Sequence, residues 1–127
     1  MIVSTKGRYA LRVMLNFARR DREEYIPLKE IAEEENISQK YLESIRSCLS
    51  KAGYVDAVHG KGGGYRLNRD PGEYTVGSIL KLTEGSIDAV AQGAGCGQTK
   101  PMWDRLNRMI DEFFEEITIA DLLKDHT

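Results

Sequence analysis

Residues 54–67 constrain the fold of this 127-residue chain more than any other segment. Tyr54–Val58 alternates like a β-strand, Tyr65–Leu67 alternates again, and a tip rich in glycine and lysine lies between them. Two short alternating segments joined by a glycine-rich stretch predict a β-hairpin. Because a helix-like stretch comes directly before it, the chain must pack a small two-stranded sheet against helices.

Two predicted helices precede the hairpin. Pro27 suits the first turn of a short helix from Leu28 to Glu35. A longer helix runs from Gln39 to about Ala52 and ends at Gly53, where a left-handed residue is expected. Between them, Asn36 tolerates left-handed backbone and Ser38 is a good N-cap. Two helices joined by so short a turn form a helix-turn-helix unit.

The longer helix has an apolar face of Leu42, Ile45 and Leu49. A polar face lies opposite, and it is either simply solvated or suited to duplex DNA. Lysines can neutralise phosphates, and short serines allow close approach to the groove. Glu43 can accept a bond from a cytosine amino group in the major groove, or it is solvated or paired with a nearby lysine. The polar face consists of Lys40, Glu43, Ser44, Ser47 and Lys51.

The remaining helices follow from periodicity and caps. A first helix from about Thr5 to Arg20 places Leu11, Met14, Leu15 and Ala18 on one stripe, with Ser4 or Thr5 as its cap. Thr75 can cap a fourth helix, Val76 to Thr83. Pro101 opens a fifth helix to about Glu116, and a capping box at 118–121 starts a short last helix. Residues 84–100 lack periodicity, which predicts a flexible loop.

The glycine-rich tip has three interpretations. A phosphate-binding loop must lead from a strand into a helix, whereas here a strand follows, so a nucleotide site is disfavoured. The tip is then either a floppy hairpin or a wing that enters the minor groove. In a wing, His59, Lys61 and Arg66 lie near the DNA backbone.

The fifth helix carries more apolar surface than one contact face requires. Met102, Leu106, Met109 and Phe113 are spaced 4, 3 and 4 residues apart, which is typical of a coiled coil. The helix is therefore either buried in its own domain or pairs with a second copy of the chain. The residues predicted to dimerise are Met102, Trp103, Leu106, Met109, Ile110, Phe113 and Phe114.

Composition narrows the function. The net charge is −2, but residues 1–70 hold 13 Lys/Arg against 10 Asp/Glu, so the basic charge lies in the N-terminal part. We expect a cytoplasmic protein, because no apolar signal or membrane segment is evident and two cysteines cannot form a disulfide framework. His59 and His126 suggest no catalytic arrangement, so no enzyme is expected. The acidic run 33–35 is expected to be solvated.

Several motifs resemble one family. Ser4–Leu11, Ile37–Glu43 and Gly60–Tyr65 are similar to the Rrf-two type winged-helix repressors, which include IscR, NsrR and CymR. The resemblance implies a mainly α fold with a small β-hairpin. It divides the chain into a winged helix-turn-helix domain (1–83), a flexible sensor-type loop (84–100), and a long dimerisation helix with a short C-terminal helix (101–127).

The resemblance also implies a homodimer that binds an imperfect palindrome in double-stranded DNA. Many relatives carry arginine where this chain has His59, so minor-groove insertion is expected to be weaker or pH-dependent. The residues expected to contact DNA lie on the polar face of the third predicted helix, at the hairpin tip and at the basic start of the first helix. The residues expected to contact DNA are Lys6, Arg8, Tyr9, Ser38, Gln39, Lys40, Tyr41, Glu43, Ser44, Ser47, Lys51, His59, Gly60, Lys61 and Arg66.

The sensor loop departs from the cluster-binding relatives, which offer three cysteines there. This chain has only Cys96 in the loop, and Cys48 lies in the third predicted helix. Since a cluster needs about four ligands, we expect no iron–sulfur cluster, no metal and no other cofactor. Cys96 is either a reversible redox sensor or an inert surface thiol.

Taken together, the sequence predicts a transcriptional repressor that responds to a redox signal, a metabolite or a protein partner. The alternative is a protein-interaction module that keeps the winged fold without sequence-specific DNA binding.

Overall fold

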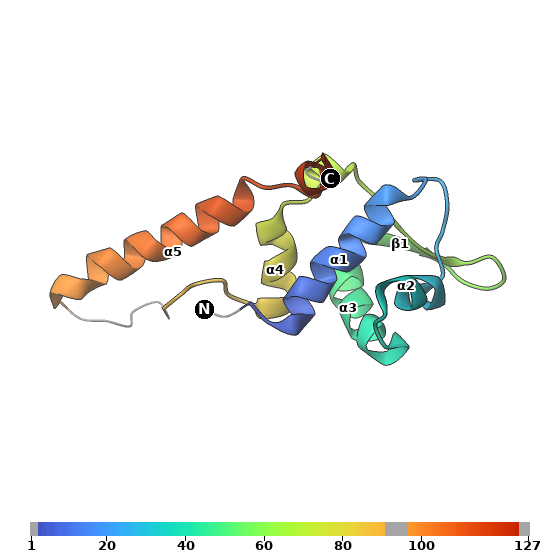
Figure 1. Ribbon diagram of the computed structural model, residues 1–127, viewed down its shortest axis with the longest axis horizontal. Helices are drawn as coiled ribbons and strands as arrows, with labels where there is room; N and C mark the ends of the chain where they lie inside the picture. Colours follow the sequence, from blue (N-terminus) through green and yellow to red (C-terminus); the bar gives the residue numbers. More distant parts are fainter. Residues whose placement is uncertain (1–2, 91–96, 125–127) are drawn as a thin grey trace.

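The computed structural model describes residues 3–90 and 97–124. It is mainly α-helical with one hairpin, as predicted (Figure 1). The elements in chain order are α1 (Thr5–Arg19), α2 (Leu28–Glu35), α3 (Gln39–Lys51), β1 (Val55–Val58), β2 (Gly64–Leu67), the 3₁₀ turn η1 (Pro71–Glu73), α4 (Val76–Glu84), the 3₁₀ turn η2 (Gly97–Thr99), α5 (Lys100–Glu115) and α6 (Ile119–Lys124).

Most helices begin and end within one residue of the predicted positions, because capping residues determine their ends. Ser4 rather than Thr5 caps α1, and its hydroxyl accepts the Gly7 N–H at 3.0 Å. Asn36 adopts left-handed backbone with φ 55° at the end of α2. The Ser38 hydroxyl then accepts the Tyr41 N–H at 3.1 Å and starts α3. Such caps satisfy backbone donors that the helix itself leaves unpaired.

α1 is the central helix, and its buried face is broader than the predicted stripe. Of that stripe only Met14 is fully buried, whereas Ala10, Val13 and Phe17 are buried without having been predicted. The physical reason is that α1 packs against α2, α4 and α6, so its neighbours surround more than one side. A single amphipathic stripe describes a helix with one neighbour.

The hairpin is fixed to the helical body at its base. β1 and β2 pair antiparallel from Val55 opposite Leu67 to Val58 opposite Gly64. Ile26, in the link between α1 and α2, extends the sheet by exchanging both backbone hydrogen bonds with Tyr65, at 2.8 and 2.9 Å. The two-stranded wing therefore rests on a third short segment.

Tyr74 holds together the two ends of the hairpin through hydrogen bonds. Its side chain is fully buried, and its hydroxyl donates to the Tyr54 carbonyl at 2.9 Å while accepting the Asn68 and Arg69 N–H groups. Burial raises the pKa of the Tyr74 phenol above its ordinary value. A lone tyrosine after a turn gives no sequence signal for this role.

A polar network joins α1 to α2. The Asn16 side chain is 4% exposed, and its amide nitrogen donates to the carboxylates of Glu34 at 2.9 Å and Glu35 at 2.8 Å. Its oxygen accepts the Arg20 Nε–H at 2.9 Å, and Arg20 also pairs with Glu30 and Glu34. The acidic run on α2 was expected to be merely solvated, which is wrong for Glu34 and Glu35, because both face polar groups of α1.

Asn16→Ala is expected to lower the free energy of unfolding by about 1–3 kcal/mol at neutral pH, because it removes a buried hydrogen-bonding group. The Asn16 amide, and next the Arg20 guanidinium, hold the pKa of Glu34 below its ordinary 4.5. A lowered folded-state pKa contributes stability above 4.5 that is lost as the pH falls through the folded value.

Denaturant unfolding of Asn16→Ala and the unmodified chain should therefore differ at neutral pH, and the difference should narrow without vanishing well below pH 4.5. Because the Glu34 side chain is half exposed, its own share is small. Glu33→Gln, an exposed change on the same helix, is the control and should match the unmodified chain. A gap between Asn16→Ala and the unmodified chain that is independent of pH would contradict the role of these carboxylates.

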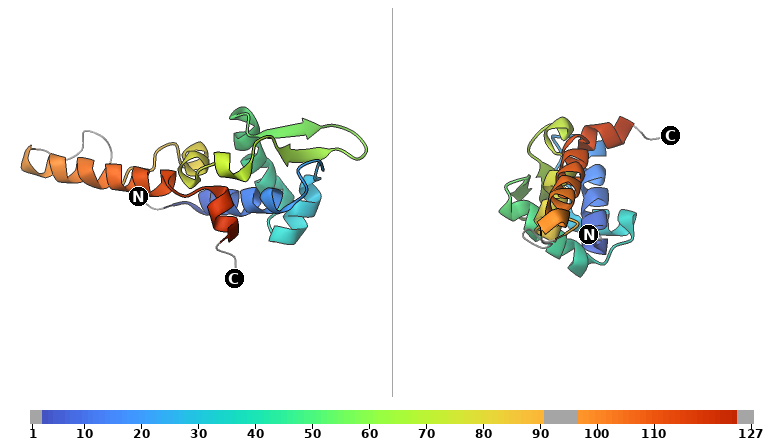
Figure 2. Two further views of the ribbon diagram at one scale, coloured as in Figure 1. Left: turned by 90° about the horizontal axis from the view of Figure 1, so that it is seen from above. Right: turned by 90° about the vertical axis from the view of Figure 1, so that its left-hand side faces the viewer.

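α5 extends away from the compact body at the end opposite the wing (Figures 1 and 2). None of its residues is buried. Ile110 and Phe114 pack against a small cluster that contains Leu80 of α4, and α6 then returns to lie against α1 and η1. Within residues 3–90 and 97–124, no helix is long and apolar enough to cross a membrane.

Candidate nucleic-acid interface

The outer face of α3 is open to solvent. Lys40, Glu43, Ser44 and Lys51 are exposed and Ser47 is half-buried, whereas Leu42, Ile45 and Leu49 are buried as predicted. Ser38 and Gln39 at the start of α3 are also exposed. The helix therefore presents a continuous polar face that starts at its N-terminus.

The start of α1 lies next to the start of α3. Lys6 of α1 and four residues at the beginning of α3 surround an open hollow of about 390 Å³. The rings of Tyr9 and Tyr41 are 5.7 Å apart and join the two helices beside it. Arg8 is exposed on the same helix end. The residues that line the hollow are Lys6, Ser38, Lys40, Tyr41 and Ser44.

The tip of the hairpin is exposed at His59, Gly60 and Lys61. Gly60 and Gly62 have φ values of 94° and 78°, a backbone region that favours glycine. The Gly63 N–H donates to the Gly60 carbonyl at 3.0 Å, so the tip forms a closed turn. It projects beyond α2 (Figure 1). This geometry leaves Lys61 free to approach a phosphate.

Arg66 has a guanidinium whose partners lie in another segment of the chain. It donates to the carbonyl oxygens of Arg22 and Glu23, both at 3.3 Å, and lies 4.3 Å from the centroid of the Tyr25 ring. These contacts fasten β2 to the link between α1 and α2. A role in DNA contact for Arg66 is thus weaker than one in holding the wing.

Glu43 has a partner that the sequence analysis missed. It was weighed as solvated or paired with a lysine, but its carboxylate accepts from Arg46 Nη2 at 3.0 Å. Arg46 lies at the border of the polar face, three residues further along α3, a spacing that brings side chains together on a helix. That i,i+3 spacing was the available signal.

α5 divides its apolar side chains between two directions. Ile110 and Phe114 face α4, whereas Met102, Met109 and Phe113 are 54%, 56% and 58% exposed. The remaining two predicted dimerisation residues, Trp103 and Leu106, are half-buried. The alternative of a singly buried helix is inconsistent with this exposure. A strip of large exposed side chains on one helix marks a contact surface.

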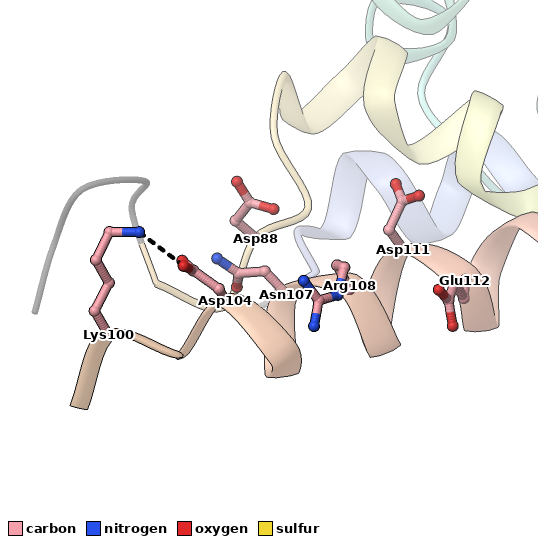
Figure 3. Close-up of a pocket in the computed structure, with 7 residues that line it drawn as sticks. All are labelled: Asp88, Lys100, Asp104, Asn107, Arg108, Asp111 and Glu112. Atoms are coloured by element: carbon pink, nitrogen blue, oxygen red, sulfur yellow. Dashed lines mark hydrogen bonds and ion pairs between the residues drawn. The ribbon is translucent and has the colours of Figure 1, made fainter. Parts of the chain in front are cut away.

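A second hollow, of about 640 Å³, lies along α5 and is strongly polar (Figure 3). Lys100 pairs with Asp104 at 2.7 Å. Asn107 holds the segment after α4, since its side chain accepts the Ala89 N–H at 2.8 Å and donates to the Val90 carbonyl at 2.9 Å. The lining residues are Asp88, Lys100, Asp104, Asn107, Arg108, Asp111 and Glu112. Its carboxylates make it unsuitable for a DNA backbone.

The predicted sensor loop is only partly described. Residues 84–90 and 97–100 lie in the described part, and Cys96 lies outside it. Cys48 is a free, half-buried thiol in α3. The redox role predicted for Cys96 therefore stays a prediction.

Comparisons with known proteins show which family this chain resembles in sequence and structure. A model of the Rrf2 family, described as iron-dependent transcriptional regulator, matches residues 3–125. The HTH-type transcriptional regulator IscR of Vibrio campbellii is 38% identical over 99% of this chain and 79% of its own length.

Two solved structures are also similar. CymR, the global cysteine regulator of B. subtilis, has a TM-score of 0.87 at 34% identity and covers 100% of this chain and 99% of its own. IscR of T. potens has a TM-score of 0.80 at 37% identity and covers 98% and 88%. The named relatives are regulators rather than enzymes.

These matches contradict the expectation that the chain carries no iron–sulfur cluster and no other cofactor. The matching family is described as iron-dependent, and its relatives include proteins named IscR. The expectation was based only on the number of cysteines in one loop, and this number does not exclude a cofactor. Among residues 3–90 and 97–124, no group of three or more His, Cys, Asp or Glu side chains is placed to hold a metal ion. The described residues alone do not fit such a centre.

The family match covers nearly the whole chain, and the helix-turn-helix, the wing and the projecting helix all lie where such a regulator needs them. The chain belongs to the Rrf2 family of transcriptional regulators.

Proposed function

We propose that this chain is a homodimeric repressor that binds an imperfect palindrome in double-stranded DNA. The observation that carries the proposal is the hollow where Lys6 of α1 meets Ser38, Lys40, Tyr41 and Ser44 of α3. It combines basic groups, hydroxyls and the N-terminus of a helix, which are the groups that bind phosphates. The α3 face beside it is free to enter a major groove.

Within this proposal, α3 reads bases and the wing positions the protein. Glu43 is exposed on α3 and has acceptor oxygens for a cytosine amino group. Lys61 at the wing tip contacts the phosphate backbone, and His59 and Gly60 lie beside it at the tip. Tyr9, Gln39, Ser47 and Lys51 complete the surface from positions beside α3 or along it.

Dimerisation supplies the second α3. The exposed strip of α5 pairs with the same strip of another copy, which gives an isologous interface. Two recognition helices related by a two-fold axis match the symmetry of a palindrome. Residues 1–83 form the DNA-binding domain in this proposal, 84–100 the sensor-type loop, and 101–127 the dimerisation and C-terminal helices.

The proposal places the protein in the cytoplasm and assigns it no catalytic activity. Its inducing signal is a redox change, a metabolite or a protein partner. Cys96 is the proposed site of a redox signal, since a cysteine thiol can be oxidised reversibly.

Binding to selected genomic fragments across a salt series tests the proposal. Specific DNA binding predicts a much tighter complex with selected fragments than with random duplex. The affinity should fall by about 0.9 log units per neutralised phosphate for each log unit of salt. Weak binding of the protein to selected fragments and random duplex alike would instead support the protein-interaction module, which the family match already disfavours.

Glu43→Ala and Lys61→Ala should have different effects. Removing a base contact is expected to lower the ratio of specific to random affinity about tenfold, since such contacts contribute roughly 1–3 kcal/mol of discrimination. Removing the wing lysine should weaken both duplexes alike and reduce the salt slope by about one. Fluorescence anisotropy on both duplexes measures this. Lys124→Ala on α6 is the charge-matched control, and equal losses for both variants would contradict the division of roles.

A further inference from the structure

We infer that Arg46 is a positioning residue that holds Glu43 in its DNA-facing orientation and connects it to the wing. The inference rests on the proposed function, because it takes Glu43 as a residue that faces DNA. Arg46 itself has no place among the predicted DNA contacts.

The contacts of Arg46 link two elements. Its Nη2 donates to Glu43 Oε2 at 3.0 Å within α3. Its guanidinium carbon lies 5.5 Å from the centroid of the Tyr65 ring on β2. The Arg46 side chain is 27% exposed against 47% for Glu43, so the arginine is the more enclosed partner. One side chain therefore bridges the recognition helix and the wing.

Tyr65 offers a rigid platform for this bridge. Its backbone N–H and carbonyl are both bonded to Ile26, and it pairs with Ala57 of β1. A guanidinium on an aromatic face has a defined plane, and its fork of donors then has a defined direction. A glutamate bonded to that fork loses the freedom to sample several rotamers before it meets DNA.

The environment of Arg46 Nε shows that other contacts hold the guanidinium. Among the described residues this buried nitrogen has no hydrogen-bond partner. A buried donor without a partner is unfavourable, so an arginine free to move would turn Nε toward water. The Glu43 carboxylate and the Tyr65 ring must outweigh that cost.

This arrangement engages Oε2 of Glu43 and leaves Oε1 as the acceptor available to a base. It differs from a direct contact between Arg46 and a DNA phosphate, which would act on every sequence alike. Specificity against total affinity thus separates the two roles.

The test uses a double-mutant cycle on the full chain. Arg46→Met keeps an unbranched stem beside Tyr65 but removes the charge and the fork. Arg46→Lys keeps the charge, and Tyr65→Phe keeps the ring as a control. Each variant, Glu43→Ala and the double variant Arg46→Met/Glu43→Ala are titrated with the selected operator and with random duplex, after thermal unfolding has shown that each is folded.

We expect Arg46→Met to lower the specific-to-random affinity ratio about tenfold, as Glu43→Ala does, with little change on random duplex. The double variant should be no worse than Glu43→Ala, because both changes remove one interaction. Arg46→Lys should restore part of the ratio, and Tyr65→Phe should leave it unchanged.

Additive losses in the double variant, or equal losses on both duplexes with a reduced salt slope, would overturn the inference and make Arg46 an independent phosphate contact. If the unmodified chain does not distinguish operator from random duplex, the proposed function itself fails. The two failures are therefore distinguishable.

Discussion

Phe113→Asp is expected to convert the protein into a monomer that binds its operator at least about 100-fold more weakly. Phe113 is 58% exposed in the single chain and lies on the same strip of α5 as Met109. In a symmetric dimer the substitution places two carboxylates in one apolar interface. An uncompensated buried charge costs roughly 3–5 kcal/mol, which corresponds to a loss of two or more orders of magnitude in affinity.

Two measurements distinguish the loss of the dimer from the loss of DNA binding. Sedimentation velocity over a concentration series reports the dimer, and titration of the full palindrome and of a single half-site reports DNA binding. The variant should bind both DNAs equally weakly, because one α3 reaches one half-site. The unmodified chain should prefer the palindrome.

Arg108→Asp is the matched control. It also introduces a carboxylate into α5, but Arg108 lies about 130° around the helix from the apolar strip at 100° per residue. This variant should remain dimeric. A dimeric Phe113→Asp protein would show that another surface joins the two copies, and tight palindrome binding by a monomer would remove dimerisation from the mechanism.

Much of the fold could be predicted because its signals are local. The cap at Ser38, the left-handed Asn36 and the alternation in 54–67 depend on near neighbours in sequence, and the structure has all three. The buried face of α1 was predicted only in part, because it depends on three packed helices. Periodicity within one helix does not reveal how many neighbours surround it.

In the candidate site, too, the local features could be predicted from the sequence and the contacts between distant segments could not. Exposed positions on α3 and at the wing tip follow from helical period and turn composition. The contact of Arg46 with the Tyr65 ring and the partners of Arg66 depend instead on where β2 lies relative to α3 and to residues 22–25, and no sequence spacing encodes those distances. The cofactor prediction failed for a related reason, since it drew a conclusion from the residues of one loop.

Gly64→Ala is expected to lower the free energy of unfolding by about 2–4 kcal/mol, a large effect for one methyl group. From sequence, Gly64 belongs to a flexible tip, but in the structure it is the first residue of β2. A Cβ at this position would lie 2.3 Å from the carbonyl carbon of Ile26 and 2.4 Å from its oxygen. Backbone atoms cannot move aside as a flexible side chain can.

The clash would separate Ile26 from Tyr65 and weaken the two hydrogen bonds that hold the wing to the body. The melting temperature should fall by roughly 10 °C. Gly72→Ala is the control, because its Cβ would lie 3.9 Å from the nearest atom, Ala120 Cβ, and its stability should change little.

The same variant also tests how the wing and α3 depend on one another. Displacing Tyr65 removes the platform of Arg46, so Gly64→Ala should lose operator specificity at temperatures where it is still folded. Tyr65 connects Ile26 to that guanidinium through its backbone and its ring, whereas Lys61 at the tip stays exposed. Random-duplex affinity should therefore fall less than operator affinity. An unchanged melting temperature would mean that the wing does not rest on Ile26 in solution, and the connection from wing to recognition helix would fail with it.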